Sequence, residues 1–177
     1  MPRLFIGVMV PEQVKSDIVA LQESMARMPM RCKLVEPENL HISMSFLGEV
    51  PEADVGRISG ELDVVCGNHR SFTVKISGVS FIPNERFARV IALGCESSGE
   101  ELESLRRNIA NSVGGDSHRA HLTLARVREI VDRNFVVKNL GDNDLEKYFE
   151  VSDVSLVRSY ISRTGPSYQI LHRSSLQ

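Results

Sequence analysis

The sequence contains no tryptophan, only three cysteines and almost no net charge. Cys32, Cys66 and Cys95 are widely spaced and include no Cys-x-x-Cys pair, which argues against a zinc or redox motif and predicts free thiols in a reducing compartment. The formal net charge of −2 creates no protein-wide field that could hold a long nucleic acid by charge alone. We therefore expect any nucleic acid partner to be bound locally, at an end.

Long apolar runs and low-complexity linkers are also absent. The apolar run from Leu4 to Val10 is too short to span a bilayer, and no small-residue cleavage site follows it. It fits a buried first strand, so we expect a cytoplasmic protein with no membrane partner. The 177 residues, 42% of them hydrophobic, are sufficient to bury a core and predict one two-lobed domain over residues 1–177.

Strand and helix patterns recur in two similar halves. The predicted strands are residues 4–10, 31–35, 41–47, 71–81, 87–93 and 120–127, followed by a hairpin of 149–161 and 168–172 around Gly165-Pro166. Helical spacing predicts helices after Pro11, near Pro51, and after a capping box formed by Ser98 and Glu101. This order predicts an α+β fold in which each half is an antiparallel sheet backed by helices.

Each half contains one His-x-Ser/Thr-x tetrapeptide on a predicted strand. Because side chains alternate along a strand, His41 and Ser43 share one face while Phe46 lies on the core face. His121 and Thr123 share the matching face in the second half. If the two sheets face each other, these two imidazoles and two hydroxyls form one four-group pocket.

Such a pocket suits a phosphodiester. Opening a cyclic phosphate requires a base for the attacking water and an acid for the departing ribose oxygen, and histidine, with an ordinary pKa of about 6.5, can serve as either. The hydroxyls of Ser43 and Thr123 can donate hydrogen bonds to the non-bridging oxygens. A single tetrapeptide of this kind is more often structural, so the prediction depends on the matched pair.

Metal binding is not expected at these motifs. His118 lies three residues before His121, and on one strand this spacing directs the two rings to opposite faces. A metal-dependent phosphodiesterase would also need more carboxylates near the histidines than Glu38, Glu49 and Asp116 supply.

Taken together, the motifs resemble the two-histidine phosphoesterase superfamily and, within it, the LigT-like RNA 2′,3′-cyclic phosphodiesterases, formerly called 2′-5′ RNA ligases. The resemblance covers nearly the whole chain and depends on residues 3–8, 38–43, 46–48, 81–84, 89–91, 121–126 and 165–168. It implies a bilobal, pseudo-symmetric α+β fold with two antiparallel sheets facing a central cleft and helices on the outside. It also implies that no metal or other cofactor is used.

The resemblance further implies roles for six residues. His41 corresponds to the proton donor for the leaving 3′ oxygen and His121 to the proton acceptor that activates water, with a 2′-phosphate as product. Ser43 and Thr123 are the hydroxyl residues of the two motifs. Ser43 stands where threonine is usual, so we expect weaker positioning of its hydroxyl without loss of chemistry.

Two further residues match substrate-binding positions of the family. Arg126 matches an arginine near the phosphate or terminal nucleotide, although simple alternation places it opposite His121, so it can contribute only where the strand bulges, twists or ends. Tyr168 follows the Gly165-Pro166 turn as the family tyrosine does, and it either borders the cleft or packs the hairpin.

Several functions remain open at this point. The first is hydrolysis of 2′,3′-cyclic phosphates at RNA ends, tRNA halves included, by a monomer, with 2′-5′ joining as the reverse reaction. The second moves the same chemistry to a small cyclic nucleotide or nucleotide-sugar cyclic phosphate. The third is a non-catalytic module that binds RNA ends, and the presence of both complete motifs argues against it.

Overall fold

A computed structural model describes residues 2–177 of the chain. Its elements, with η for short 3-10 helices, are β1 (Arg3–Met9), α1 (Glu12–Ala26), β2 (Met30–Leu34), η1 (Pro37–Asn39), β3 (His41–Glu49), η2 (Glu52–Asp54), α2 (Val55–Gly67), β4 (Phe72–Ile82), η3 (Glu85–Phe87), β5 (Val90–Ser97), α3 (Glu101–Val113), β6 (His121–Ile130), α4 (Arg133–Gly141), β7 (Glu146–Val151), β8 (Asp153–Ser162) and β9 (Gly165–Ser175).

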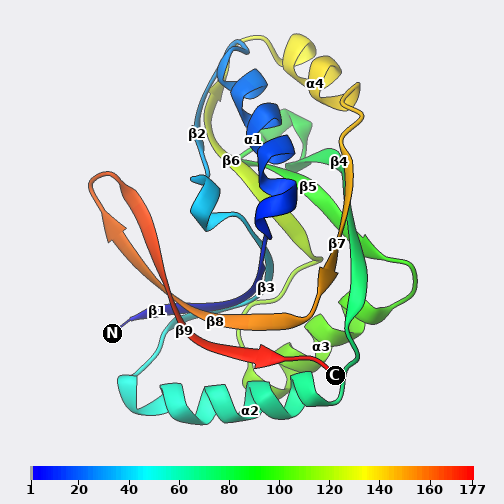
Figure 1. Cartoon of the computed structure of the whole chain (residues 1–177). Coiled ribbons are helices and arrows are strands. Elements are labelled where there is room, and N and C mark those ends of the chain that lie inside the picture. The colour runs from blue at the N-terminus through cyan, green and yellow to red at the C-terminus, as the bar shows by residue number, and fades with distance from the viewer. Residues whose placement is uncertain (1) are drawn as a thin grey trace.

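The nine strands of residues 2–177 form one antiparallel sheet, which is strongly curled (Figure 1). The order is β7-β4-β5-β6-β3-β1-β8-β9, and β2 pairs with the far end of β6. The two halves meet where Ile42 of β3 pairs with Leu122 of β6, inside the two tetrapeptides. The predicted α+β fold is therefore confirmed, and its two sheets are halves of one continuous sheet.

The helices lie on the outside of this sheet. Helix α2 lies below β8 and β9, and α3 packs against α2 and against β3 and β5, whereas α1 lies at the opposite end, near β2 and β6 (Figure 1). The stripe of α1 predicted to face the core is buried, because its members recur at helical spacing: Val14, Ile18, Leu21 and Met25. No helix within residues 2–177 has both the length and the apolar character needed to cross a membrane.

The predicted capping box at the start of α3 was wrong: a cap at Ser98 would start the helix at residue 99, whereas α3 begins at Glu101. Ser97, and not Ser98, accepts a hydrogen bond from the backbone N–H of Leu102 at 3.1 Å. The carboxylate of Glu101 accepts one from the N–H of Gly99 at 3.0 Å. The hydroxyl thus comes from Ser97 in place of Ser98, and neither side chain accepts the hydrogen bond that a capping box predicts.

The prediction for the C-terminal part of the chain missed two elements, α4 and β7. Helix α4 begins after Asp132, whose side chain accepts a hydrogen bond from the N–H of Phe135. Residues 149–161, predicted as one strand, divide at Ser152 between β7 and β8. The reason is a change of partner: β7 pairs with β4 in one half of the sheet, and β8 pairs with β1 in the other.

Candidate active site

A cleft of about 560 Å³ lies where the two halves of the sheet meet. All six residues singled out from the sequence line it: His41, Ser43, His121, Thr123, Arg126 and Tyr168. Other polar lining residues include Arg3, Lys33, Glu36, Ser45, Asp116, His118 and Ser159. The apolar lining consists of Phe5, Leu34, Val35, Met44, Phe46, Ile161 and Pro166.

The two histidines are oriented in the same way. Nδ1 of His41 lies 2.7 Å from the carbonyl oxygen of Asn39, and Nδ1 of His121 lies 3.0 Å from that of Arg119. Because a carbonyl oxygen only accepts hydrogen bonds, each Nδ1 carries a hydrogen and donates it. The two Nε2 atoms are therefore free to exchange protons with a substrate. The Ser43 hydroxyl lies 3.2 Å from Nε2 of His41.

Each motif strand contains a β-bulge immediately after its hydroxyl residue. Along β1 the partners of β3 pass from Ser43 to Ser45, which leaves Met44 without a partner. Along β5 the partners of β6 pass from Thr123 to Ala125, which leaves Leu124 without one. An extra residue of this kind shifts the alternation of all later side chains by one position.

The bulges decide which side chains reach the cleft. Ser45 and Ala125 are buried, whereas Phe46 and Arg126 are exposed and line the cleft at corresponding positions of the two halves. The prediction that Phe46 faces the core was therefore wrong. The bulge at Leu124 likewise moves the Arg126 side chain to the face of β6 that carries His121.

The two imidazoles nevertheless have different surroundings. The ring of Phe5 stacks on His41 with a centroid distance of 4.6 Å and an interplanar angle of 29°, and Tyr168 contacts both rings edge-on. Burial lowers the pKa of His41; the hydrogen bond to Asn39 opposes this, and the positive charges of His121 and Arg126 add to it. Tyr168 thus borders the cleft and packs the hairpin at once.

One wall of the cleft is the end of the β8–β9 hairpin. Pairing between β1 and β8 ends at Arg3 and Ser159, so the following residues of the hairpin pair only with each other. This end projects past β1 (Figure 1). Ile161 and Pro166 line the cleft from it, and Tyr168 lines the cleft at its border, opposite Ser159.

Positive charge is available in the cleft for an anion. Lys33 and Arg126 are directly opposite each other on β2 and β6. Lys33 lies 3.6 Å from the carboxylate of Glu36, whereas Arg126 forms no ion pair with any carboxylate of residues 2–177.

Over the same residues, no three His, Cys, Asp or Glu side chains form a group that could hold a metal ion.

Sequence reasoning missed Phe5, Phe46 and Asn39 as parts of this site. Phe5 belongs to an apolar run that looks like ordinary core, and only the pairing of β1 with β3 places it beside His41. Phe46 reaches the cleft only through the bulge at Met44. Asn39 is adjacent to the first motif in sequence, a position that could have suggested a supporting role.

The fold and the paired tetrapeptides define a two-histidine phosphoesterase, and the comparisons with known proteins identify the family. The family described as "LigT like Phosphoesterase" matches residues 8–92. An RNA 2′,3′-cyclic phosphodiesterase of Methanocaldococcus jannaschii is 32% identical over 96% of this chain and 98% of its own. The chain belongs to the LigT-like phosphoesterase family.

A second relative and two solved structures are similar over nearly the whole chain. An RNA 2′,3′-cyclic phosphodiesterase of Methanothermobacter thermautotrophicus is 30% identical over 94% of each chain. The crystal structure of TT0787 from Thermus thermophilus superposes with a TM-score of 0.81 and 26% identity, over 98% of this chain and 97% of that one. E. coli LigT in its apo form, at 20% identity, shares the fold with a TM-score of 0.76 over 99% and 98% of the two chains.

Proposed function

We propose that this protein hydrolyses 2′,3′-cyclic phosphates at RNA ends to 2′-phosphomonoesters, without a metal ion. The observation that carries the proposal is the pair of histidines at one cleft, each fixed at Nδ1 by a backbone carbonyl and each followed by a hydroxyl residue. The relatives from Methanothermobacter thermautotrophicus and Methanocaldococcus jannaschii are RNA 2′,3′-cyclic phosphodiesterases, which supports RNA as the substrate. In this proposal the 177 residues act as one two-lobed domain in a cytoplasmic monomer, and tRNA halves are among the substrates.

The proposed reaction is a single in-line displacement at phosphorus. His121 accepts a proton from water at Nε2 while the water oxygen forms a bond to phosphorus. The bond from phosphorus to O3′ breaks, and His41 donates a proton from Nε2 to that oxygen. The products are a 2′-phosphate and a 3′-hydroxyl, and exchange of one proton with solvent restores both histidines.

The charged side chains and hydroxyls of the cleft serve the same step in this proposal. Ser43 and Thr123 donate hydrogen bonds to the non-bridging oxygens, and Arg126 stabilises the charge that builds there. Phe46, exposed on the opposite half, offers its ring to the terminal base. Proton donation by His41 requires its charged form, which burial opposes and which an adjacent phosphate anion favours.

Joining of two RNAs uses the same groups in the same direction. The 5′-hydroxyl of a second RNA replaces water and attacks the cyclic phosphate, with His121 again as base. The bond from phosphorus to O3′ breaks, His41 protonates that oxygen, and the product has a 2′-5′ linkage. We propose this joining as a minor activity, because water is always present in excess over RNA ends.

A direct test uses a short RNA that ends in a 2′,3′-cyclic phosphate, incubated with purified protein in excess chelator. The proposal expects conversion to the 2′-phosphate, resolved from the 3′-phosphate by chromatography. Conversion of 2′,3′-cyclic mononucleotides but not of the RNA would instead establish a small-nucleotide phosphodiesterase. Saturable binding of the RNA end without turnover would establish a binding module.

A further inference from the structure

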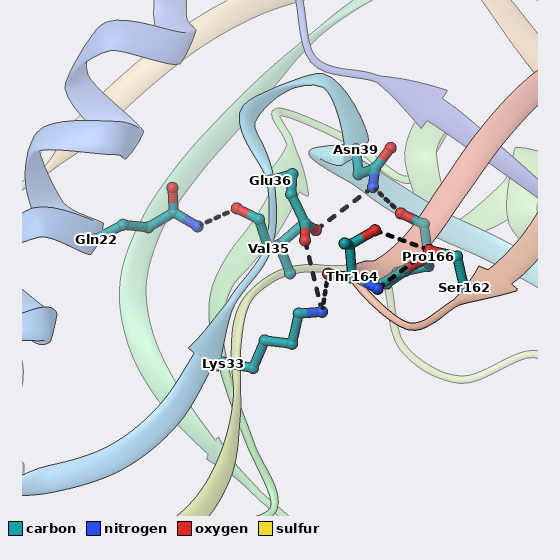
Figure 2. Close-up of polar contacts among 9 residues, drawn as sticks. Gln22, Lys33, Val35, Glu36, Asn39, Ser162, Thr164 and Pro166 are labelled. Carbon is teal, nitrogen blue, oxygen red and sulfur yellow. Dashed lines mark hydrogen bonds and ion pairs between the residues drawn. The ribbon is translucent and has the colours of Figure 1, made fainter.

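The projecting end of the β8–β9 hairpin is attached to the rest of the protein through two of its backbone carbonyls. Nδ2 of Asn39 donates a hydrogen bond to the carbonyl of Pro166 at 2.8 Å, and Nζ of Lys33 donates one to the carbonyl of Thr164 at 3.0 Å. Figure 2 shows both contacts, with Glu36 between the two donors. We call Lys33, Glu36 and Asn39 the hairpin latch.

Asn39 connects this latch directly to His41. Its backbone carbonyl accepts the hydrogen bond from Nδ1 of His41, while its side chain holds the hairpin. The side chain is almost completely buried, with 3% of the residue exposed. A buried amide with satisfied donors is fixed in place, because breaking its contacts would leave polar groups without partners.

The hairpin carries the ring that packs against His41. Tyr168 follows Pro166 by two residues, and its ring lies edge-on to His41 at a centroid distance of 5.6 Å and to Phe5 at 4.8 Å. His41 is thus fixed on three sides, by the Asn39 carbonyl, the Phe5 ring and the Tyr168 ring. Two of these three contacts depend on the position of Asn39.

The second motif has no equivalent arrangement. Arg119 occupies the position two residues before His121 and supplies the corresponding carbonyl, but its side chain is exposed and reaches no hairpin. Within residues 2–177, the aromatic contacts of the cleft all gather around His41. Support from a latched hairpin is therefore specific to one of the two histidines.

We propose that Asn39 is a positioning residue for His41, acting through the hairpin latch to keep Tyr168 packed on the imidazole. The expected effect on turnover rests on the proposed function of the cleft, whereas the packing of His41 does not. When the latch is broken, residues 160–167 are held only by their own strand pairing. Tyr168 lies at the border of this end, opposite Ser159, the last residue of β8 that pairs with β1. Its ring then shifts on the imidazole, and water reaches His41. The imidazole then samples orientations that do not point Nε2 at the leaving oxygen.

The latch can also be opened from the hairpin side, at an exposed turn. Gly165 has a φ of +133°, a value that side-chain-bearing residues rarely adopt. A Cβ at this position would meet Nζ of Lys33 and lie 2.9 Å from Oε1 of Glu36. Gly165→Ala therefore strains the turn and displaces Lys33 and Glu36 of the latch without altering the buried Asn39, which complements Asn39→Ala.

The charge state of His41 reports on the latch independently of turnover. The titratable and charged groups that face His41 are His121, Arg126 and Tyr168, and the hydroxyl of Ser43 lies at its Nε2. Opening the hairpin leaves His121 and Arg126 in place and reduces the burial that disfavours the imidazolium. We therefore expect the pKa of His41 to rise towards its ordinary value in both latch variants.

The test compares Asn39→Ala and Gly165→Ala with wild type and with Ser167→Ala, a control on the exposed hairpin surface. We expect kcat on the cyclic-phosphate RNA to fall about 10- to 100-fold in both latch variants, with a smaller change in KM. NMR titration of 15N-labelled histidines should show the rise for His41 in the latch variants and not in Ser167→Ala.

Each outcome of this test is decisive. Wild-type kcat and an unchanged His41 titration in Gly165→Ala would overturn the proposal, and this holds even where Asn39→Ala fails to fold. Inactivity of the wild-type protein on the RNA would contradict the proposed function alone, because the NMR titration still tests the positioning of His41. A fall in kcat with no change in the His41 titration would show that the latch acts elsewhere, and would also overturn the proposal.

Discussion

Gln22 of α1 is expected to stabilise the bulge that brings Arg126 into the cleft. Its buried side chain donates hydrogen bonds from Nε2 to the carbonyl of Val35 at 2.8 Å and to the carbonyl of Leu124, the bulged residue, at 2.9 Å. The Leu124 carbonyl also accepts from the N–H of Val35, so it keeps one partner without Gln22. The Val35 carbonyl would lose the partner that Gln22 supplies.

The expected cost of Gln22→Leu follows from these two contacts. The Val35 carbonyl is only part-buried, so water can replace Gln22 there, and the Leu124 carbonyl keeps another partner; each lost hydrogen bond therefore costs about 0.5–1.5 kcal/mol. The free energy of unfolding should fall by about 1–3 kcal/mol, measured by urea denaturation with an unchanged m-value. Turnover should fall as well, because a loosened bulge no longer fixes Arg126.

The matched control is Gln13→Leu, the same change on the exposed face of the same helix. It should alter the free energy of unfolding by no more than about 0.5 kcal/mol. Equal effects of the two substitutions would refute the reasoning. The reasoning would also be refuted if Gln22→Leu lost the expected free energy of unfolding but kept wild-type kinetics, because the bulge would then not depend on this side chain.

Three further outcomes are expected. Arg126→Met should cost about 1.5–3 kcal/mol in kcat/KM, as expected for a hydrogen bond from a charged donor, with an unchanged melting temperature; wild-type kcat/KM would remove Arg126 from the site. Ser43→Thr should retain turnover while Ser43→Ala lowers it about 100-fold or more, and equal activity of all three would show that the hydroxyl is unused. Burial lowers the pKa of His41, so below about pH 6.5 the unfolded chain binds more protons than the folded protein. Acidification should therefore lower the melting temperature of wild type more than that of His41→Gln. Parallel curves of melting temperature against pH for the two proteins would contradict this.

The sequence was sufficient for much of the fold because its signals are local. The buried stripe of α1 and the alternation at the start of both motif strands depend only on spacing, and the structure confirms them. Division of residues 149–161 into β7 and β8 depends instead on which strand each segment pairs with. That choice is set by contacts far apart in the chain, which spacing does not report.

The candidate site shows the same limit more sharply. Four cleft residues, His41, Ser43, His121 and Thr123, follow from alternation alone and line the cleft. Phe46 and Arg126 depend on bulges, and a bulge is a property of two paired strands, so one strand's sequence cannot reveal it. Phe5 reached the site for a similar reason, since only the β1–β3 register places it on His41.

The central claim is metal-free chemistry by His41 and His121, and single-turnover hydrolysis of a cyclic-phosphate RNA in excess chelator tests it most directly. The account predicts formation of the 2′-phosphate by wild type, and a loss of about 100- to 10,000-fold in the rate of the chemical step for His41→Ala and for His121→Ala, each with a near-wild-type melting temperature. Wild-type rates in either variant would contradict the account, and global unfolding of both would show that the histidines are structural.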